Sequence, residues 1–367
     1  MALAPATAWT KLVGGASGEY AQSVSTASDG SIYIAGRSEG SIDGQIYNGS
    51  ADAFIAKFNS DGTKIWTKLL GGASWENVYS VSTASNGSIY IGGWTDGSID
   101  GQINKGGKGI AFITKFNSDG TKIWTKLLGE ASWYNVTWVS TASDGSIYIA
   151  GTTLDNIDGE INNGSSDAFI TKLNSDGTKI WTKLLGGASA DTAYRVSTAS
   201  DGSIYLAGTT SGSIDGQINN GLGDAFITKF NSDGTKIWTK LVGGASYDFA
   251  YSVSTASDGS IYIAGYTEGN IDGQIYNGGS ADAFITKLNS DGTKIWTKLV
   301  GGASGDYPWS VRPPAMDLSI LQDRQTAVSM DKSITEIMMH LLLSLIVMEL
   351  RYGQKYYSGN PLTLPLR

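Results

Sequence analysis

The sequence predicts an all-β protein built from repeated antiparallel units, and three observations carry this prediction. A motif that reads Trp-Thr-Lys-Leu, then Leu or Val, then Gly recurs at intervals of 57 or 58 residues. Runs rich in β-branched and aromatic residues follow each copy and end at Asp-Gly or Asn-Gly. Between Trp9 and Val311 no helical periodicity interrupts them. The copies begin at Trp9, Trp66, Trp124, Trp181, Trp238 and Trp296.

Each unit carries four strand signals. The Asp-Gly pairs supply the positive φ values that tight hairpins need. Three of the four connections in a unit are short, so consecutive strands are expected to pair in one antiparallel meander. In the fourth unit the four signals are YRVSTA (194–199), SIYLAG (203–208), AFITKF (225–230) and TKIWTKLV (235–242).

A four-stranded meander that repeats along a chain is typical of a β-propeller, with one blade per unit. We therefore expect a propeller of four-stranded antiparallel blades, with five complete blades and a disrupted sixth. The first motif copy, in residues 7–13, has no earlier strands of its own and is expected to close the ring onto the last blade. A β-solenoid is the alternative, but its coils are shorter and need no Asp-Gly hairpins.

The units resemble the bacterial SBBP-type β-propeller repeat. The resemblance lies in the WTKLLG start, the GSIYIAG core and the DAFITKFNSDG close, and it covers about residues 9–311. It implies a propeller that is common in secreted or surface proteins and has no shared catalytic activity. We therefore expect an extracellular or cell-surface location, with the cytoplasm left open. The family has no defined active-site motif, so the resemblance assigns no functional residue.

The chain changes character after Val311. Residues 315–350 hold five of the six methionines and the only histidine, His340. With a suitable choice of codons, reading this stretch one nucleotide earlier yields DGSIYIAG and then the rest of a complete repeat. We therefore predict a propeller domain over 1–311 and a frameshifted remnant of a further repeat, without a native-like fold, over 312–367. A separate C-terminal helix is the alternative, and no role is assigned to His340.

Composition excludes several classes of function. The net charge is −8 and the pI is near 4.7, which argues against nucleic acid and against an anionic membrane surface. Cysteine is absent, so disulfides and cysteine metal sites are excluded. The N-terminus has no signal-peptide pattern. The longest apolar run, residues 337–348, is too short to span a bilayer.

Ligand contacts, if there are any, are expected on one face of the ring. The two Asp-Gly turns of a unit share one face, whereas the second-to-third and unit-to-unit connections share the other and vary most. An aromatic and acidic rim there suits sugar rings or peptide segments; the alternative is packing between blades. The aromatic candidates are Tyr20, Trp75, Trp94, Trp133, Tyr134, Tyr247, Phe249 and Tyr266, with Glu19, Glu76, Asp191 and Asp248 among them.

Acidic residues in the long connection raise the question of calcium. Carboxylates in Gly/Asn-rich loops can bind this cation, but they also shape loops through local hydrogen bonds. A further aspartate precedes the third strand in four units, at Asp52, Asp167, Asp224 and Asp282, whereas the second unit has Ile110 there. The weak calcium candidates are the aspartates of the repeated Ile-Asp-Gly motif, Asp43, Asp100, Asp158, Asp215 and Asp272. We expect no other metal or cofactor.

The sequence thus predicts a non-enzymatic binding or structural module, whose partner is an unknown protein, peptide or glycan. No histidine precedes residue 312, so a serine triad has no base. A carbohydrate-active enzyme that uses acidic loop residues is one alternative, and a non-functional fragment of a longer repeat protein is another. The repeated Lys57, Lys115 and Lys172 are expected on a solvated face.

Overall fold

The computed structural model describes residues 9–105, 109–129, 134–312 and 320–325. These residues form strands and no helix, and the strands build five four-stranded sheets and one two-stranded sheet. Every four-stranded sheet is an antiparallel meander of consecutive strands. The predicted all-β propeller of four-stranded antiparallel blades is confirmed. No described segment is a helix long and apolar enough to cross a membrane.

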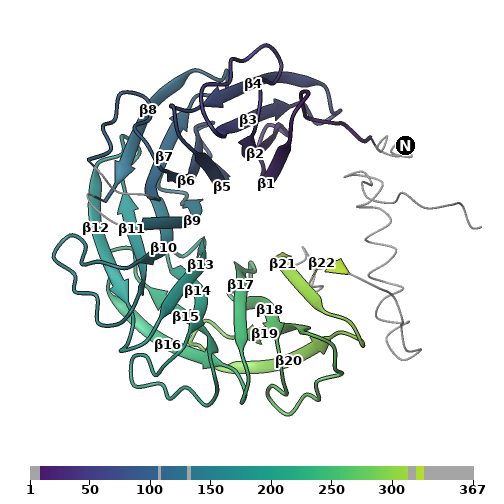
Figure 1. Cartoon of the computed structure of the whole chain (residues 1–367). Coiled ribbons are helices and arrows are strands. Elements are labelled where there is room, and N and C mark those ends of the chain that lie inside the picture. The colour runs from purple at the N-terminus through teal and green to yellow at the C-terminus, as the bar shows by residue number, and fades with distance from the viewer. Residues whose placement is uncertain (1–8, 106–108, 130–133, 313–319, 326–367) are drawn as a thin grey trace, which may run out of the picture.

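The blades stand around a ring, with the first strand of each blade innermost (Figure 1). The first strands are β1 (Glu19–Thr26), β5 (Glu76–Thr83), β9 (Tyr134–Thr141), β13 (Asp191–Thr198) and β17 (Asp248–Thr255). The second strands are β2 (Ile32–Ser38), β6 (Ile89–Thr95), β10 (Ile147–Thr153), β14 (Ile204–Thr210) and β18 (Ile261–Thr267). The third strands are β3 (Asp52–Phe58), β7 (Ile110–Phe116), β11 (Asp167–Leu173), β15 (Asp224–Phe230) and β19 (Asp282–Leu288). The fourth strands are β4 (Lys64–Leu70), β8 (Lys122–Leu128), β12 (Lys179–Leu185), β16 (Lys236–Val242) and β20 (Lys294–Val300).

The hydrophobic core lies between neighbouring blades. At the first junction, Tyr33 and Ile55 of one blade pack in the same buried cluster as Phe112 of the next. The repeated tryptophan anchors this packing: the Trp66 ring lies 5.9 Å from that of Tyr33, and its Nε1 donates to the carbonyl of Ser118 in the next blade at 3.3 Å. A blade therefore cannot bury its apolar faces alone, as is usual in repeat architectures.

The third-strand lysines fasten each blade to the next. The Lys57 ammonium donates to the carbonyl of Ser118 at 2.9 Å and lies 5.4 Å from the centre of the Tyr33 ring. The expectation of a solvated face is correct only in part: Lys57 and Lys115 are half-buried and Lys172 is buried, and the charged end of each reaches the neighbouring turn. The equivalent contacts are Lys115 with Ser175, Lys172 with Ser232 and Lys229 with Ser290.

The N-terminal segment lies where the fourth strand of a preceding blade would lie. Trp9 Nε1 donates to the carbonyl of Ser60 at 3.0 Å, and its ring stacks on Phe58 with centroids 6.5 Å apart. This repeats the relation of Trp66 to the second blade. Residues 9–18 nevertheless form no strand, because no third strand lies beside them in the described structure.

The other end of the ring is a pair of strands. β21 (Asp306–Arg312) pairs with β22 (Ile320–Gln325), and Asp306 lies opposite Gln325 as Asp248 lies opposite Thr267 in the fifth blade. β21 and β22 therefore take the places of the first two strands of a sixth blade. Figure 1 shows the ring interrupted between this pair and β1. The rest of the predicted frameshifted segment, with His340 and the methionines, lies outside the described residues, and the frameshift stays a prediction.

Candidate functional site

Every blade presents one variable pair of residues at the same place on its two inner strands. The two residues face each other across the strands, next to a glycine of the second strand in the five complete blades. This pair and the neighbouring bulge residue of the first strand are positions where the units differ chemically. The pairs are Tyr20 with Arg37, Asn77 with Trp94, Asn135 with Thr152, Thr192 with Thr209, Phe249 with Tyr266, and Tyr307 with Arg324.

The pair of the fifth blade lies at the centre of an aromatic cluster. Phe249 lies 4.7 Å from Tyr266 between ring centroids, and Tyr266 lies 4.9 Å from Tyr307 of the next blade. Tyr194 of the fourth blade stacks on Tyr251 at 4.5 Å. Tyr247, just before β17, stacks on Phe249 at 6.0 Å. These six rings form a continuous aromatic cluster across three blades, and the other five lie on β13, β17, β18 and β21, whose places in the ring are seen in Figure 1.

A β-bulge sets the direction of these rings. The pairing of β17 with β18 shifts between Ala250 and Ser252, which leaves Tyr251 as the extra residue. Gly265 lies opposite, where an added Cβ would stand only 1.6 Å from the Phe249 carbonyl oxygen. The absence of a side chain at Gly265 thus allows β17 to approach closely while the bulge turns the Tyr251 ring toward its neighbours.

The cluster is partly open to solvent. Tyr247 is 38% exposed, and the other described rings of the cluster are half-buried. Burial raises the pKa of Tyr194, Tyr251 and Tyr266 above the ordinary tyrosine value. The Tyr251 hydroxyl is hydrogen-bonded to both Tyr194 and Tyr266, so these three hydroxyls bond one another.

Three of the remaining predicted aromatic residues, Tyr20, Trp75 and Trp94, belong to the first two repeat units. The Arg37 guanidinium lies 4.3 Å from the Tyr20 ring centre and 5.6 Å from that of Trp75. Trp94 Nε1 donates to the Tyr79 hydroxyl at 3.2 Å. Trp133 lies outside the described residues, and Tyr134 is the first residue of β9.

The structure therefore gathers only three of the eight predicted aromatic residues, Tyr247, Phe249 and Tyr266, into one surface. Sequence reasoning missed Tyr194, Tyr251 and Tyr307. The first two are the extra residues of strand bulges, and a bulge position cannot be located from the alternation of side chains alone. Their variation along the first strand was the signal that could have indicated them.

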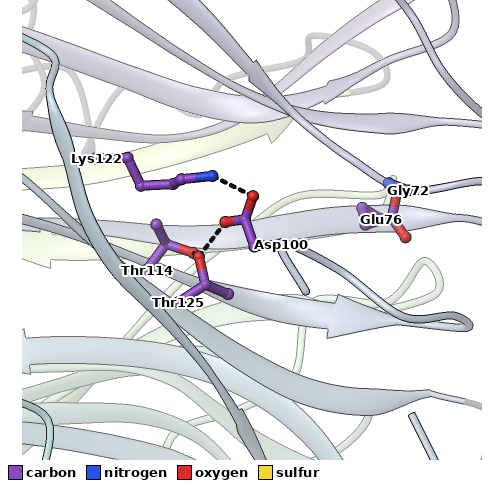
Figure 2. Close-up of polar contacts among 6 residues, drawn as sticks. All are labelled: Gly72, Glu76, Asp100, Thr114, Lys122 and Thr125. Carbon is purple, nitrogen blue, oxygen red and sulfur yellow. Dashed lines mark hydrogen bonds and ion pairs between the residues drawn. The ribbon is translucent and has the colours of Figure 1, made fainter. Parts of the chain in front are cut away.

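The aspartates of the Ile-Asp-Gly motif have a structural role in every blade. Asp100 accepts hydrogen bonds from the Lys122 ammonium and from the Thr125 hydroxyl of the fourth strand (Figure 2). Thr125 in turn lies 3.0 Å from the hydroxyl of Thr114 on the third strand. The contact ties the long connection to the outer edge of its own blade. The equivalent pairs are Asp43 with Lys64, Asp158 with Lys179, Asp215 with Lys236 and Asp272 with Lys294.

These aspartates also hold a left-handed backbone. All five have φ between 51° and 54° and are the non-glycine residues with positive φ among those described. Aspartate adopts this region more readily than most residues because its short polar side chain bonds locally. Among the described residues, no group of three acidic or histidine side chains could hold a metal ion. Calcium binding by these aspartates stays a prediction, and the cation would have to displace a lysine.

A second set of carboxylates lies buried where one blade meets the next. Glu76 begins β5 and accepts the Gly72 N–H at 2.9 Å (Figure 2). Glu76, Asp191 and Asp248 are fully buried, so they cannot touch a ligand on the rim as the sequence suggested. Glu19 begins β1, which no blade precedes in the described structure, and it lies 3.4 Å from the Ser38 hydroxyl.

A cavity of about 900 Å³ lies elsewhere, between the second and third blades. Ile110, Leu128 and Ile157 give it an apolar wall, and Lys126 and Lys179 add charge. Residues 106–108 and 130–133, which border it in sequence, lie outside the described residues. The aromatic cluster is the candidate site whose residues all lie in the described part of the chain.

Two family models match the chain. The SBBP β-propeller repeat matches residues 180–215 and 237–272. A β-propeller domain of unknown function, DUF5122, matches residues 27–64, 142–179 and 256–294.

Two curated proteins are similar at low identity. Regulatory protein FlaEY of Caulobacter vibrioides is 26% identical over 186 residues, which cover 45% of this chain and 20% of that protein. The uncharacterized WD repeat-containing protein L264 of Acanthamoeba polyphaga mimivirus is 22% identical over 328 residues, which cover 66% of this chain and 24% of that protein. The chain thus spans about a fifth to a quarter of the length of these relatives.

Among solved structures, the WD40 domain of Pan2 from Neurospora crassa is similar with a TM-score of 0.44 and 10% identity. The match covers 82% of this chain and 85% of that domain.

Proposed function

Because the chain is a β-propeller repeat protein, we propose that it is a non-enzymatic binding module and that its ligand docks on the aromatic cluster of the last blades. The proposed ligand is a glycan, and the proposed setting is extracellular or at the cell surface, where repeats of the kind it resembles are common.

The observation that carries the proposal is the place of the aromatic cluster in an otherwise repetitive ring. Strand ladders, Asp-Gly turns and Asp–Lys contacts recur in every complete blade, so they serve the scaffold. The variable pair differs from blade to blade, and only the fifth blade places two aromatic rings, Phe249 and Tyr266, in it. Binding residues tend to be those that a rigid scaffold presents and that vary on it.

The chemistry of the cluster fits sugar rings. Flat aromatic faces bury the apolar face of a pyranose, and a partly exposed ring keeps a polar end free for hydrogen bonds. Tyr247 and its neighbours supply such faces. An apolar peptide side chain could use the same faces, so a peptide is the outcome against which glycan binding is tested.

The enzyme alternative has less support. Glycoside hydrolysis needs two carboxylates that reach the substrate in a cleft. Of the four acidic residues that the sequence placed on the rim, Glu76, Asp191 and Asp248 are buried at blade junctions, and Glu19 is half-buried on the first blade. Glu268 is the exposed carboxylate beside Tyr247 and Tyr266, and one carboxylate does not supply the pair that hydrolysis needs.

The experiment grafts the variable pair of the fourth blade into the fifth. Phe249→Thr with Tyr266→Thr copies Thr192 and Thr209, which the same fold position already accommodates. The intact protein and this double variant are screened against a glycan array and a peptide library. We expect the intact protein to bind a set of glycans and the variant to lose at least roughly tenfold in affinity, the equivalent of one stacked ring at about 1.4 kcal/mol.

The matched control makes the same graft in the second blade, Asn77→Thr with Trp94→Thr. It should keep glycan binding, since Trp94 lies outside the cluster. If the control graft abolishes binding and the fifth-blade graft does not, the site is wrongly placed. If the intact protein binds peptides and no glycan, the proposed ligand class is wrong.

A further inference from the structure

Pairs of buried carboxylates meet at four of the blade junctions. In each pair, the residue that begins a third strand faces the residue that begins the first strand of the next blade. All eight residues are at most 5% exposed. The pairs are Asp52 with Glu76, Asp167 with Asp191, Asp224 with Asp248, and Asp282 with Asp306.

The pair of the fourth and fifth blades shows how closely the two groups approach. Both press against Gly243: a Cβ added there would stand 2.3 Å from Asp224 Oδ1 and 2.9 Å from Asp248 Oδ2. Asp248 Oδ2 accepts the Gly244 N–H at 2.8 Å, and Asp224 Oδ2 accepts the Asn220 N–H at 3.3 Å. Asp224 Oδ1 is buried without a hydrogen-bond partner.

Within the described part of the chain, no ion pair joins Asp224 or Asp248 to a cation. Two other carboxylates act on Asp248. Asp224 lies on the third strand of the neighbouring blade, and Asp272 lies in the long connection of the same blade as Asp248. Asp272 is already paired with Lys294. β18 contributes the neutral Thr267, and the turn contributes the backbone of Gly243 and Gly244. Two adjacent buried negative charges without a counter-ion are costly, so one of the groups is expected to be neutral.

We propose that each of these four junctions is a proton-binding site, in which two buried carboxylates share one proton, and that loss of the proton weakens the contact between the blades. Among the described residues, these carboxylates belong to no group of three acidic or histidine side chains that could hold a metal ion. When the proton passes to a base in solution, both carboxylates carry a negative charge across the junction.

One blade junction lacks the pair of buried carboxylates. At the junction of the second and third blades, Ile110 stands in place of the third-strand aspartate and Tyr134 begins the next first strand. Both acids are thus replaced together, while the strands still form the same four-stranded sheets. The acids are therefore dispensable for the blade geometry, and their pairing elsewhere needs a reason other than strand formation.

The expected pH dependence follows from linkage. Burial raises the pKa of Asp248 to about 7 and that of Asp191 to about 6, whereas an unfolded aspartate titrates near about 3.9. The native state then binds more protons than the unfolded state between about pH 4 and pH 7. The stability from these groups is fully present below the unfolded value and is lost as pH rises through the folded values.

The test measures thermal unfolding of the full chain and of Asp248→Asn at about pH 5.5 and pH 8. An asparagine can accept from Gly244 and donate to Asp224, as the protonated acid does. We expect the Tm of the intact protein to fall on going to pH 8. At pH 8 the variant should melt roughly 2–4 °C above the intact protein, and its Tm should depend less on pH.

The control is Asp258→Asn at an exposed turn, where the Ser260 N–H lowers the pKa of the carboxyl. This group is ionised over the whole interval, so the variant should keep the pH dependence of the intact protein. A Tm of the intact protein that is constant or rises toward pH 8 would overturn the proposal. So would an undiminished pH dependence in Asp248→Asn.

Two further measurements distinguish a shared proton from a bound cation and from a loss of folding in the variant. Calcium chloride added at pH 8 should leave the Tm unchanged; a rise that Asp248→Asn abolishes would mean a cation site instead. If Asp248→Asn does not fold, urea unfolding of the intact protein at several pH values gives the proton uptake on folding directly. The free energy of unfolding should fall from pH 5.5 to 8, and a free energy that rises or stays constant over this interval would refute the shared proton.

Discussion

The aspartate of the Ile-Asp-Gly motif has several structural roles that the sequence pattern does not indicate. Asp100 combines a left-handed backbone, an ion pair with Lys122 and a hydrogen bond from Thr125 (Figure 2). The side chain of Lys122 is 40% exposed, so the ion pair itself contributes little. The backbone conformation and the buried threonine bond carry more of the stabilisation.

Three substitutions of Asp100 separate these contributions. Asn tolerates the left-handed region and can still accept from Thr125, so Asp100→Asn should cost about 0.5–1 kcal/mol. Asp100→Gly keeps the backbone without strain but loses both bonds, at about 1–2 kcal/mol. Asp100→Ala adds strain and should cost about 2–3 kcal/mol. Urea unfolding measures the order, and an alanine variant as stable as the asparagine variant would contradict it.

For single residues, the sequence predicted the role of an aspartate in its own turn better than its contacts with distant residues. The turn aspartates are turn formers as predicted: Asp29 accepts the Ser31 N–H and Asp61 the Thr63 N–H, both at 2.8 Å. The lysine partner of Asp100 lies 22 positions later on another strand. Such a contact depends on how the long connection folds back on the blade, which periodicity does not encode.

At the scale of elements, strand order and meander topology could be predicted almost completely. Asp-Gly turns of fixed length leave little choice of partner for the strands that they connect. The bulge in each first strand could not be predicted, because it adds one residue without a composition signal. As a result the rings of Tyr194 and Tyr251 were missed, although both strands had been found.

The bulge of β17 gives a prediction for its glycine. Gly265→Ala places a methyl group against the Phe249 carbonyl and must push β17 away from β18. We expect a loss of about 2–3 kcal/mol in the free energy of unfolding and weaker ligand binding, since Phe249 and Tyr266 separate. Chemical unfolding and a binding titration measure the two effects.

The neighbouring Ala264→Gly serves as its control. It removes a methyl group instead of adding one and should cost about 1 kcal/mol, with ligand binding retained. An alanine at 265 that leaves both stability and binding unchanged would mean that β17 is not held against β18 as described.

At the scale of the whole molecule, the ring that the described strands form is open at one place. Val24 of the first blade is 48% exposed, whereas its equivalents Val81, Val139, Val196 and Val253 are at most 3% exposed because a preceding blade covers them. Trp9 and its neighbours cover only part of this face. The number of blades in the ring could not be predicted from the sequence, because the repeat pattern ends where the chain changes character.

The central claim is that the aromatic cluster of the last blades is the binding site on a repetitive scaffold. Hydrogen exchange of the protein with and without the tightest-binding glycan of the array tests this claim most directly. We predict added protection in β17, β18 and β21, and exchange in the first three blades that does not change. Protection confined to the first three blades, or spread evenly around the ring, would contradict the claim.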